Sequence, residues 1–451
     1  MAAGDGAALA SGPGWVGEAL NGGGGWVLRG RIPYVLGFMM LFDSWDSVVI
    51  AFILPAIMPE WGLSSVQAGW LISSGYAGQF LGAITFGMLA EKYGRLPMLR
   101  PLVIVMSLLA IVCALAGDYT QLIVTRFVQG IAIGGALPIA ICYVNEVAPT
   151  ATRGKFFGTF QFLMLSGFGL ASLASIYVVP DLGWRVMFAL GAIPLLFVPF
   201  LYGLPESPRW LLGRGRLGDA ASALAKLGSA LPGLPEGLPD SSEAHRTPRV
   251  PVSALFEAGL RKTTLIMLAL WFLTSLVSYG LLNWVPTIYV EMFDIPIRQA
   301  FIFNSIVSVS IFILPIVLRQ TIDRIGRRPP VMLGTFIGGI ALLGLIFAPG
   351  DGWALVVGLM VVGQIGISIG SMILWPYSAE VFETRVRSLA LGICSSTARA
   401  ASMLTPILVG GLLQFTGSVL FIFLTFGATA LVVSALWWRG TRETAGRELD
   451  D

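Results

Sequence analysis

The sequence has 451 residues, of which 56% are hydrophobic and 12% are charged, and its formal net charge is +3. Its mean hydropathy of +0.81 excludes an ordinary soluble domain, and the small net charge gives no indication of nucleic-acid binding. The stretch before Trp26 has neither a basic start nor a continuous apolar core, so we predict no signal peptide.

Apolar runs of about 20 residues recur along the whole chain. Each is long enough to cross a hydrocarbon core of ~30 Å, and within lipid only a helix satisfies all the backbone polar groups of such a run. The twelve transmembrane helices that we predict are, in chain order, 33–58, 67–90, 97–117, 121–146, 155–180, 184–204, 263–290, 299–319, 329–348, 353–379, 388–413 and 418–438.

Lysine and arginine are distributed unevenly between the two sets of connections. If the N-terminus lies in the cytoplasm, 24 of the 28 basic residues fall on the cytoplasmic side of the predicted helices. Basic residues mark the cytoplasmic side of membrane proteins. We therefore predict a multi-pass protein of a bacterial inner membrane with both termini in the cytoplasm. Of the other four, Arg185 and Arg298 mark outer helix ends, and Arg126 and Arg399 lie inside predicted helices.

The two halves of the chain resemble each other. "YVNEVAPTATR" at 143–153 and "YSAEVFETRVR" at 377–387 share five residues at the same relative positions, and "AEKYGRLP" at 90–97 matches "IDRIGRRP" at 322–329 at nearly the same offset. Two matches at one offset predict two six-helix halves with the same topology. The domains that we predict are a cytoplasmic tail (1–32), an N-terminal bundle (33–204), a cytoplasmic linker (205–262), a C-terminal bundle (263–438) and a second cytoplasmic tail (439–451).

The predicted linker differs in composition from the helices on both sides. Its stretch "LPGLPEGLPDSSEAHRTPRVPVS" is rich in Pro, Gly and Ser, which is typical of a mobile connection. The preceding "LGDAASALAKLGSAL" predicts a short amphipathic surface helix. The single histidine, His245, lies in this linker, which argues against an active site based on histidine.

The repeated charged turns carry a family resemblance. Gly87–Arg95 resembles the loop signature between the second and third helices of the major facilitator superfamily, and Asp323–Arg328 is similar to its second-half copy. Glu91 stands where that signature usually has aspartate. The resemblance covers nearly the whole chain. It implies an all-α membrane protein with twelve transmembrane helices in two pseudo-symmetric six-helix bundles.

The same turns have a possible mechanical role. Short charged turns at helix ends can pair across the two halves in one conformation and separate in another, which makes a two-state latch. The alternative is that they only anchor the topology. The residues that we assign to gating are Glu91, Arg95, Glu146, Arg153, Asp323, Arg327, Glu380 and Arg387.

Other stretches narrow the resemblance within the superfamily. Pro205–Leu211 is similar to an element of sugar porters, but the seventh helix, "SYGLLNWVPTIY", lacks their paired glutamines. It looks more like the aromatic acid:proton symporters and the related organic-ion and nicotinate transporters. Asp43-Ser44-Trp45-Asp46 resembles an element of the first helix of those symporters, and Arg387 and Arg399 match two of their arginines. The resemblance implies proton-coupled symport of a small aromatic or monocarboxylic acid by alternating access, without a cofactor.

Two aspartates interrupt the first predicted helix near the middle of the membrane. Asp43 and Asp46 are three residues apart, so they lie on one face of a helix. A carboxylate facing lipid is strongly disfavoured, so we expect both to face a central cavity and to couple proton movement. We expect Arg126 in the fourth helix to be the partner of Asp46. The alternative is that one aspartate caps a helix break or pairs permanently with an arginine.

Arg399 lies deep in the eleventh predicted helix among small residues. A guanidinium at that depth needs water, a carboxylate or an anionic substrate, and its forked geometry suits a carboxylate. An ion pair that stabilises the C-terminal half is the alternative. The other residues that we expect around the substrate are Tyr76, Gln79, Gln161, Asn283, Trp284, Gln364, Trp375, Ser395 and Ser396.

Other classes of function fit the sequence less well. A membrane enzyme needs a nucleophile with its base, metal ligands or a redox centre, and the sequence indicates none of these. A proton-coupled sugar or polyol symporter and an uncoupled organic-ion facilitator of the same fold are the alternatives. We expect protons, a small organic anion and the lipid bilayer as partners, and a functional monomer.

Overall fold

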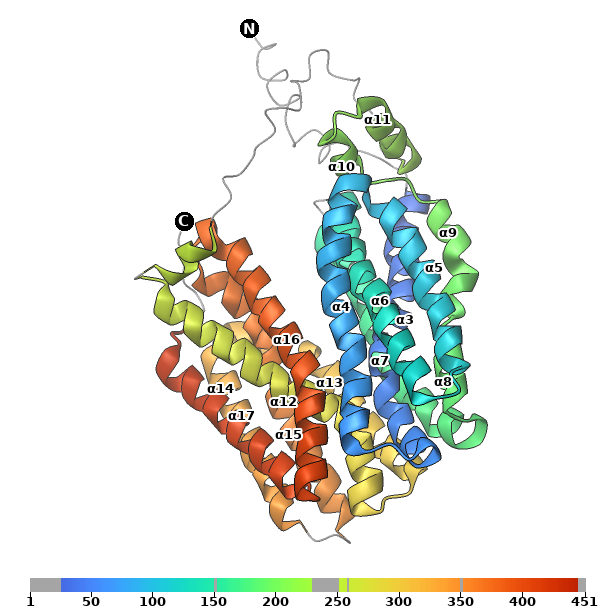
Figure 1. Cartoon of the computed structure of the whole chain (residues 1–451). Helices are drawn as coiled ribbons and strands as arrows, with labels where there is room; N and C mark the ends of the chain where they lie inside the picture. Colours follow the sequence, from blue (N-terminus) through green and yellow to red (C-terminus); the bar gives the residue numbers. More distant parts are fainter. Residues whose placement is uncertain (1–25, 150–151, 229–250, 258, 349–351, 445–451) are drawn as a thin grey trace.

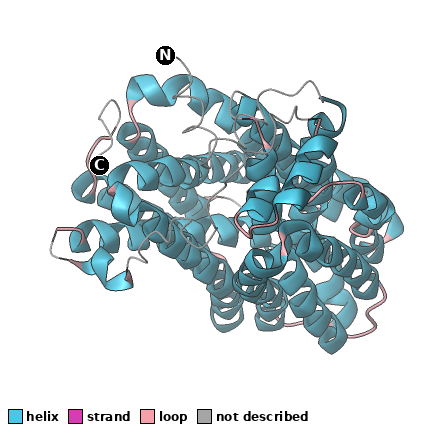
Figure 2. Ribbon diagram, turned by 90° about the horizontal axis from the view of Figure 1, so that it is seen from above, coloured by secondary structure: helices cyan, strands magenta, loops and turns pink. Residues whose placement is uncertain are grey.

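The computed structural model describes residues 26–149, 152–228, 251–257, 259–348 and 352–444 (Figure 1). Within these ranges every regular element is a helix, as the view from above also shows (Figure 2). The helices form two groups, one from each half of the chain. The fold is the predicted one, two bundles of long apolar helices joined by a linker.

The N-terminal group contains the first six spans. The last of them is broken where Pro194 and Pro199 each open a new short helix, because proline lacks the N–H that continues a helix. The elements are α3 (Trp26–Trp61), α4 (Ser65–Tyr93), α5 (Arg95–Ala114), α6 (Tyr119–Val147), α7 (Arg153–Tyr177) with η2 (Val178–Leu182), then α8 (Trp184–Leu190), η3 (Ile193–Phe197) and α9 (Val198–Tyr202).

The C-terminal group contains the other six spans. They are α12 (Arg261–Phe293), α13 (Ile297–Ile325), α14 (Arg328–Gly344) with η6 (Leu345–Phe347), α15 (Trp353–Val381), α16 (Thr384–Thr416) and α17 (Leu420–Gly440). Eleven helices of the described chain are long and apolar enough to cross a membrane. The twelfth span is α4, whose glycines, serines and glutamines lower its mean hydropathy.

Three predicted boundaries need correction. The first helix begins at Trp26 rather than at residue 33, because a helix continues into the headgroup region, where Arg29 and Arg31 are tolerated. The eighth helix continues to Ile325, beyond the predicted end at 319. The last helix continues to Gly440, beyond the predicted end at 438, and in the described residues after it Glu443 accepts hydrogen bonds from the backbone N–H groups of Arg327 and Arg328.

The linker contains three short elements within its described residues. These are α10 (Pro208–Leu212), α11 (Leu217–Lys226) and η5 (Val252–Phe256). The predicted amphipathic helix corresponds to α11, which buries Ala220, Ala223 and Leu224. The rest of the proline-rich stretch, with His245, lies outside the described residues.

Glycines let helices within the N-terminal group approach closely. A Cβ atom on Gly82 of α4 would lie 2.0 Å from the Ile131 carbonyl oxygen, and one on Gly134 of α6 would lie 2.0 Å from the Gln79 carbonyl oxygen. Apolar side chains alone give no driving force between helices in lipid, so such close packing holds them together. The close crossing of α4 and α6 therefore fixes the relative positions of Tyr76 and Gln79 on α4 and of Arg126 on α6.

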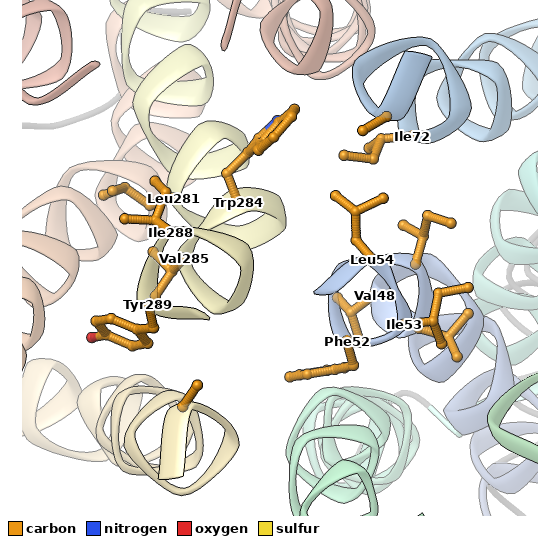
Figure 3. Close-up of a cluster of buried hydrophobic side chains, with 14 of the residues drawn as sticks. Val48, Phe52, Ile53, Leu54, Ile72, Leu281, Trp284, Val285, Ile288 and Tyr289 are labelled. Carbon is orange, nitrogen blue, oxygen red and sulfur yellow. The ribbon is translucent and has the colours of Figure 1, made fainter. Parts of the chain in front are cut away.

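The two groups meet at the end of the molecule remote from α10 and α11. There α4 packs against α16, α7 against α13, and α3 against α12. A cluster of buried apolar side chains fills this end, with Val48, Phe52, Ile53 and Leu54 from α3, Ile72 from α4, and Leu281, Trp284, Val285, Ile288 and Tyr289 from α12 (Figure 3). The groups diverge toward α10 and α11, the linker end (Figure 1).

Candidate functional site

A cavity of about 690 Å³ lies between the two groups of helices. Its lining reaches from Tyr76 and Tyr279 in the middle of their helices to Gly158 and Trp375 near the linker end. Because the groups diverge at that end, the cavity opens toward the linker. Its volume is in the range of sites for small organic molecules.

The N-terminal wall of the cavity is mainly apolar. Its polar side chains are Asp43, Ser44 and Ser47 of α3 and Tyr76 and Gln79 of α4, and the rest of this wall consists of Leu137, Gly158, Phe162, Met164, Leu165, Phe168 and Gly169. Asp43 is the one acid that lines the cavity among the described residues. It is 4% exposed, and its Oδ1 has no hydrogen-bond partner there.

The C-terminal wall is more polar. Arg399 of α16 is the one cation among the described lining residues, and its charge acts on Asp43 and Tyr279. Serines and aromatic rings share this wall with it, and the rings of Trp271 and Trp375 meet edge to face with centroids 4.8 Å apart. The wall comprises Trp271, Ser275, Ser278, Tyr279, Leu282, Ser308, Ile311, Pro315, Gln364, Ser368, Ser371, Met372, Leu374, Trp375, Ser395, Ala398, Arg399 and Ser402.

Asp46 does not face the cavity, contrary to our expectation for both aspartates. It is buried behind α3 against α6, where Arg126 Nη1 lies 2.7 Å from its Oδ2. Arg126 Nη2 also donates to the backbone carbonyl of Asp46 over 3.2 Å. Both side chains are nearly fully buried. Asp43 and Asp46 point apart because each meets a different neighbour, the cavity in one case and α6 in the other.

Several hydrogen bonds join the two groups of helices on the side of the cavity remote from the linker. The Tyr76 hydroxyl and the Asn283 side-chain amide lie within 3.2–3.3 Å of each other, and the Ser73 hydroxyl donates to the Met403 carbonyl over 2.7 Å. Ser172 and Ser305 hydroxyls lie 2.9 Å apart. These contacts close the cavity on the side remote from the linker.

Four expected substrate residues do not line the cavity. Trp284 and Asn283 are 0% exposed at the closed end, where Trp284 is part of the buried apolar cluster (Figure 3) and Asn283 is bonded to Tyr76 of α4. Gln161 of α7 has a buried Oε1 without a described partner, and the Ser396 hydroxyl donates to the Gly392 carbonyl. The expected residues that do line it are Tyr76, Gln79, Gln364, Trp375, Ser395 and Arg399.

Three residues near this site were not predicted from the sequence. Trp271 and Tyr279 of α12 line the cavity. They are eight residues apart on one side of the helix, and this spacing was a signal that the sequence offered. Gln129 is bonded to Asp46 and Arg126. Its position one turn after Arg126 on α6 was the signal that could have found it.

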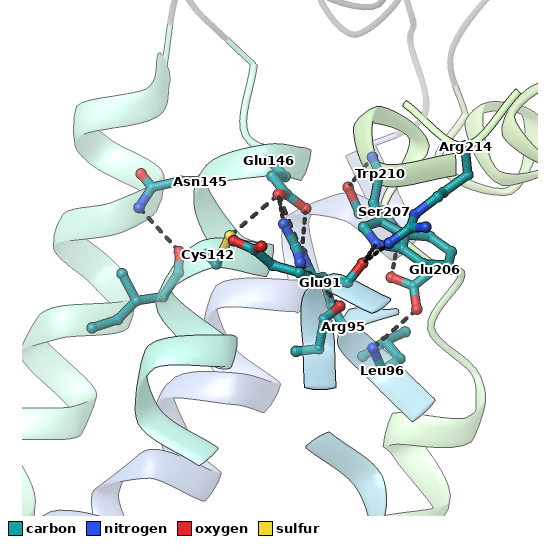
Figure 4. A network of polar contacts seen from close by, with 12 residues as sticks. Glu91, Arg95, Leu96, Cys142, Asn145, Glu146, Glu206, Ser207, Trp210 and Arg214 are labelled. Carbon is teal, nitrogen blue, oxygen red and sulfur yellow. Dashed lines mark hydrogen bonds and ion pairs between the residues drawn. The ribbon is translucent and has the colours of Figure 1, made fainter. Parts of the chain in front are cut away.

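The charged turns pair within each half rather than across the halves. In the N-terminal half, Arg95 Nη2 lies 2.8 Å from Glu146 Oε1 (Figure 4). In the C-terminal half, Arg327 Nη2 lies 3.1 Å from Glu380 Oε1. This arrangement corresponds to the separated state of the expected latch, and pairing across the halves in another conformation stays a prediction. The turns lie at the linker end, where the two groups diverge.

A second glutamate stabilises each of these turns. Glu206 accepts hydrogen bonds from the backbone N–H groups of Leu96 and Ser207 (Figure 4), and Glu443 accepts them from Arg327 and Arg328. Burial raises the pKa of Glu206, against the effect of those two N–H groups. Both glutamates thus bind the first turn of the third helix of their half, a symmetry that our repeat search did not include.

The remaining gating residues make weaker or no pairs among the described residues. The Glu91 side chain is exposed, and its carbonyl accepts from Trp210 and Arg214. Nε of Arg153 has no described partner. Arg387 Nε donates to the Phe382 carbonyl over 3.2 Å, while its Nη2 has none. The side chain of Asp323 lies outside the described residues.

Comparison with known proteins places this geometry among transporters. Residues 33–451 match the family model described as sugar (and other) transporter. A niacin transporter of Acinetobacter baylyi is 27% identical over 92% of this chain and 94% of its own length. A benzoate transport protein of the same organism is 28% identical over 85% and 83% of the two chains.

A third relative and one solved structure are also named as transport proteins. A gallate transporter of Pseudomonas putida is 32% identical over 73% of this chain and 74% of its own length. The crystal structure of a D-xylose-proton symporter superimposes with a TM-score of 0.73 and 22% identity, over 93% of this chain and 99% of that one. The similarity of that structure concerns the fold.

Proposed function

The chain belongs to the sugar (and other) transporter family of membrane transporters, and from this premise we propose that it carries a small organic acid across the membrane together with protons. The observation that carries this proposal is the pair of charges on opposite walls of one cavity. Arg399 comes from the C-terminal half and Asp43 from the N-terminal half. A cation can bind the substrate carboxylate, and a carboxylate can bind the proton.

Arg399 supports an anionic substrate. It has no ion pair with a described residue, so its charge is free for a ligand. Its forked guanidinium suits the two oxygens of a carboxylate. Tyr279, on which its charge acts, and Trp271 and Trp375 elsewhere in the same cavity supply aromatic faces, which suit a flat ring. Niacin, benzoate and gallate, for which three relatives are named, are all small aromatic carboxylates.

The two aspartates support proton coupling. Asp43 faces the cavity with an unpaired oxygen, so a proton can reach it from water in the cavity. Asp46 is held by Arg126 behind it. Intramembrane acids with a buried basic partner are typical of proton pathways. In our proposal Asp46 holds the coupled proton, and Asp43 tunes it or carries a second one.

Alternating access supplies the movement in this proposal. The structure is closed at the end formed by α3, α4, α12 and α16 and open at the linker end. The distribution of basic residues supports a cytoplasmic linker, and in our proposal this conformation is the inward-open one in a bacterial inner membrane. Rocking of the two groups about the cavity then exposes Arg399 and Asp43 to the other side. We propose that one chain is sufficient for transport.

A panel of uptake assays tests the proposal. The purified protein in liposomes, with an inward proton gradient, should accumulate radiolabelled benzoate, nicotinate or gallate, and a protonophore should abolish the accumulation. Xylose is the matched neutral substrate and should not accumulate. Accumulation of xylose without any of the acids would support the sugar symporter instead. Accumulation of an acid that a protonophore does not affect would support the uncoupled facilitator.

A further inference from the structure

Gln129 of α6 joins the two members of the buried ion pair between Asp46 and Arg126. Its Nε2 donates to Asp46 Oδ1 over 2.9 Å, and its Oε1 accepts from Arg126 Nη1 over 2.9 Å. Its side chain lies at the centre of this cluster and is 1% exposed. The amide therefore satisfies the carboxylate oxygen that Arg126 Nη1 does not reach.

The orientation of this amide is fixed by its other neighbours. The Cys113 thiol lies 3.4 Å from Gln129 Oε1, and Gln129 Nε2 lies 3.4 Å from the Met106 carbonyl oxygen. A flipped amide would set its NH₂ group against the guanidinium and the thiol, and its oxygen against a carboxylate and a carbonyl. The N–H group must therefore point at Asp46.

We propose that Gln129 is a positioning residue for the proton step, an inference that rests on the proposed proton coupling. Its N–H stabilises the ionised carboxylate of Asp46. When Asp46 takes up a proton, Arg126 loses its anion, but the Gln129 oxygen continues to accept from the guanidinium. The ring of Phe188, 5.6 Å from Arg126, adds a cation–π contact. Arg126 thus stays in place in both protonation states.

Few other polar groups face Asp46. Arg126 and Gln129 come from α6, Cys113 from α5, and Asp43 lies about one turn away on α3. Tyr76 of α4 interacts electrostatically with Arg126. The nearby α8 and the residues after it contribute only Phe188 and Gly191, which carry no charge. Removal of the Gln129 amide therefore takes away one of the two side-chain donors that stabilise the ionised form.

Infrared difference spectroscopy of the full chain in liposomes tests this role without any substrate. The band of the protonated carboxyl group is recorded against pH, and its Asp46 component is the part that disappears in Asp46→Asn. In Gln129→Leu the midpoint of this component should move upward by about 1–2 pH units. Gln129→Glu keeps the size and places a second acid beside Arg126, so it should also move the midpoint upward.

Gln121→Leu, the same change in the exposed first turn of α6, is the matched control and should keep the wild-type midpoint. An unchanged midpoint in Gln129→Leu overturns the proposal. If that variant does not fold, Gln129→Met, which also lacks the amide N–H and has a similar size, decides in the same way. A band without any Asp46 component also overturns it. Failure of wild-type liposomes to take up the acids would contradict the proposed function but leave the midpoint shift of Gln129→Leu readable.

Discussion

At the scale of single residues, the proposed binding of the substrate depends on how the guanidinium of Arg399 meets a carboxylate. Arg399 stands in the C-terminal wall among small side chains, and the hydroxyls of Ser395 and Ser402 donate to the backbone carbonyls of Gly392 and Arg399. A planar fork gives two parallel hydrogen bonds to one carboxylate, whereas an ammonium gives a point charge. The geometry of Arg399, beyond its charge, is therefore what should select the substrate.

Replacement of Arg399 by lysine tests this distinction. Arg399→Lys keeps the positive charge but loses the fork, so the dissociation constant for benzoate should rise by about tenfold or more. Isothermal titration of the purified protein measures it. Arg185→Lys, at an exposed arginine paired with Glu60, is the control and should bind as the wild type does. Equal affinity of Arg399→Lys and wild type would exclude direct recognition by this residue.

The residues that could be predicted from the sequence are those whose charged side chains cost the most free energy in lipid. Asp46 and Arg126 are charges inside apolar runs, so each needs a partner, and the two were expected together. Gln129 is neutral and fits an ordinary helix, so only its contacts show its position. Trp284 was wrongly expected at the cavity. A periodic pattern predicts which face of a helix is buried, but it does not predict whether that face meets the cavity or the closed end in a given conformation.

At the scale of helices, the seam between α4 and α16 decides whether the closed end can form. A Cβ atom on Gly69 would lie 2.5 Å from the Pro406 carbonyl oxygen, and one on Gly410 would lie 2.3 Å from the Ser65 carbonyl oxygen. These neighbours are backbone atoms of the other half, so no side-chain rotation relieves the overlap. Glycine at both positions lets the two halves touch.

A methyl group at this seam should therefore open the closed end. In Gly69→Ala and Gly410→Ala we expect a cysteine placed at Ile72, which is buried there, to react with a thiol reagent roughly tenfold faster than in the parent. Gly411→Ala is the matched control, because nothing lies within 4 Å of its added Cβ. Unchanged reactivity in both seam variants would mean that this contact does not hold the end closed.

The elements were predictable because hydropathy and length mark each span, and the twelve predicted runs correspond to the observed spans. Their ends were less predictable. Apolar composition stops at the hydrocarbon boundary, whereas α3 and α13 continue into the polar region with Arg29 and Arg324. The breaks at Pro194 and Pro199 follow from the missing N–H groups of proline. The roles of Glu206 and Glu443 depend on contacts between distant segments.

At the scale of the whole molecule, we propose that the linker end faces the cytoplasm. In a background without native cysteines, Gly218→Cys on α11 should react with a membrane-impermeant thiol reagent only from the cytoplasmic side. Gly117→Cys, between α5 and α6, should react only from the outer side. Both positions are exposed, so accessibility of the residue itself is not limiting. Labelling of intact cells and of inside-out vesicles checks this, and the reverse pattern would overturn the orientation.

In the proposed cycle the empty carrier returns only after its proton is released. Asp46→Asn imitates the protonated form permanently, so the variant can exchange substrate while loaded but cannot couple to a proton gradient. One proton with one monoanion moves no net charge, whereas two protons add about 2.3 kcal/mol per 100 mV. Separate control of voltage by potassium and valinomycin therefore distinguishes the two stoichiometries.

The most direct measurement compares net accumulation with exchange of labelled benzoate in liposomes that contain Asp46→Asn. With an inward proton gradient and the voltage held at zero, the wild type should concentrate benzoate. The variant should not concentrate it, yet it should still exchange internal for external benzoate at a rate near that of the wild type. If Asp46→Asn concentrates benzoate against its gradient, the coupled proton does not reside on Asp46 and the account of coupling is contradicted.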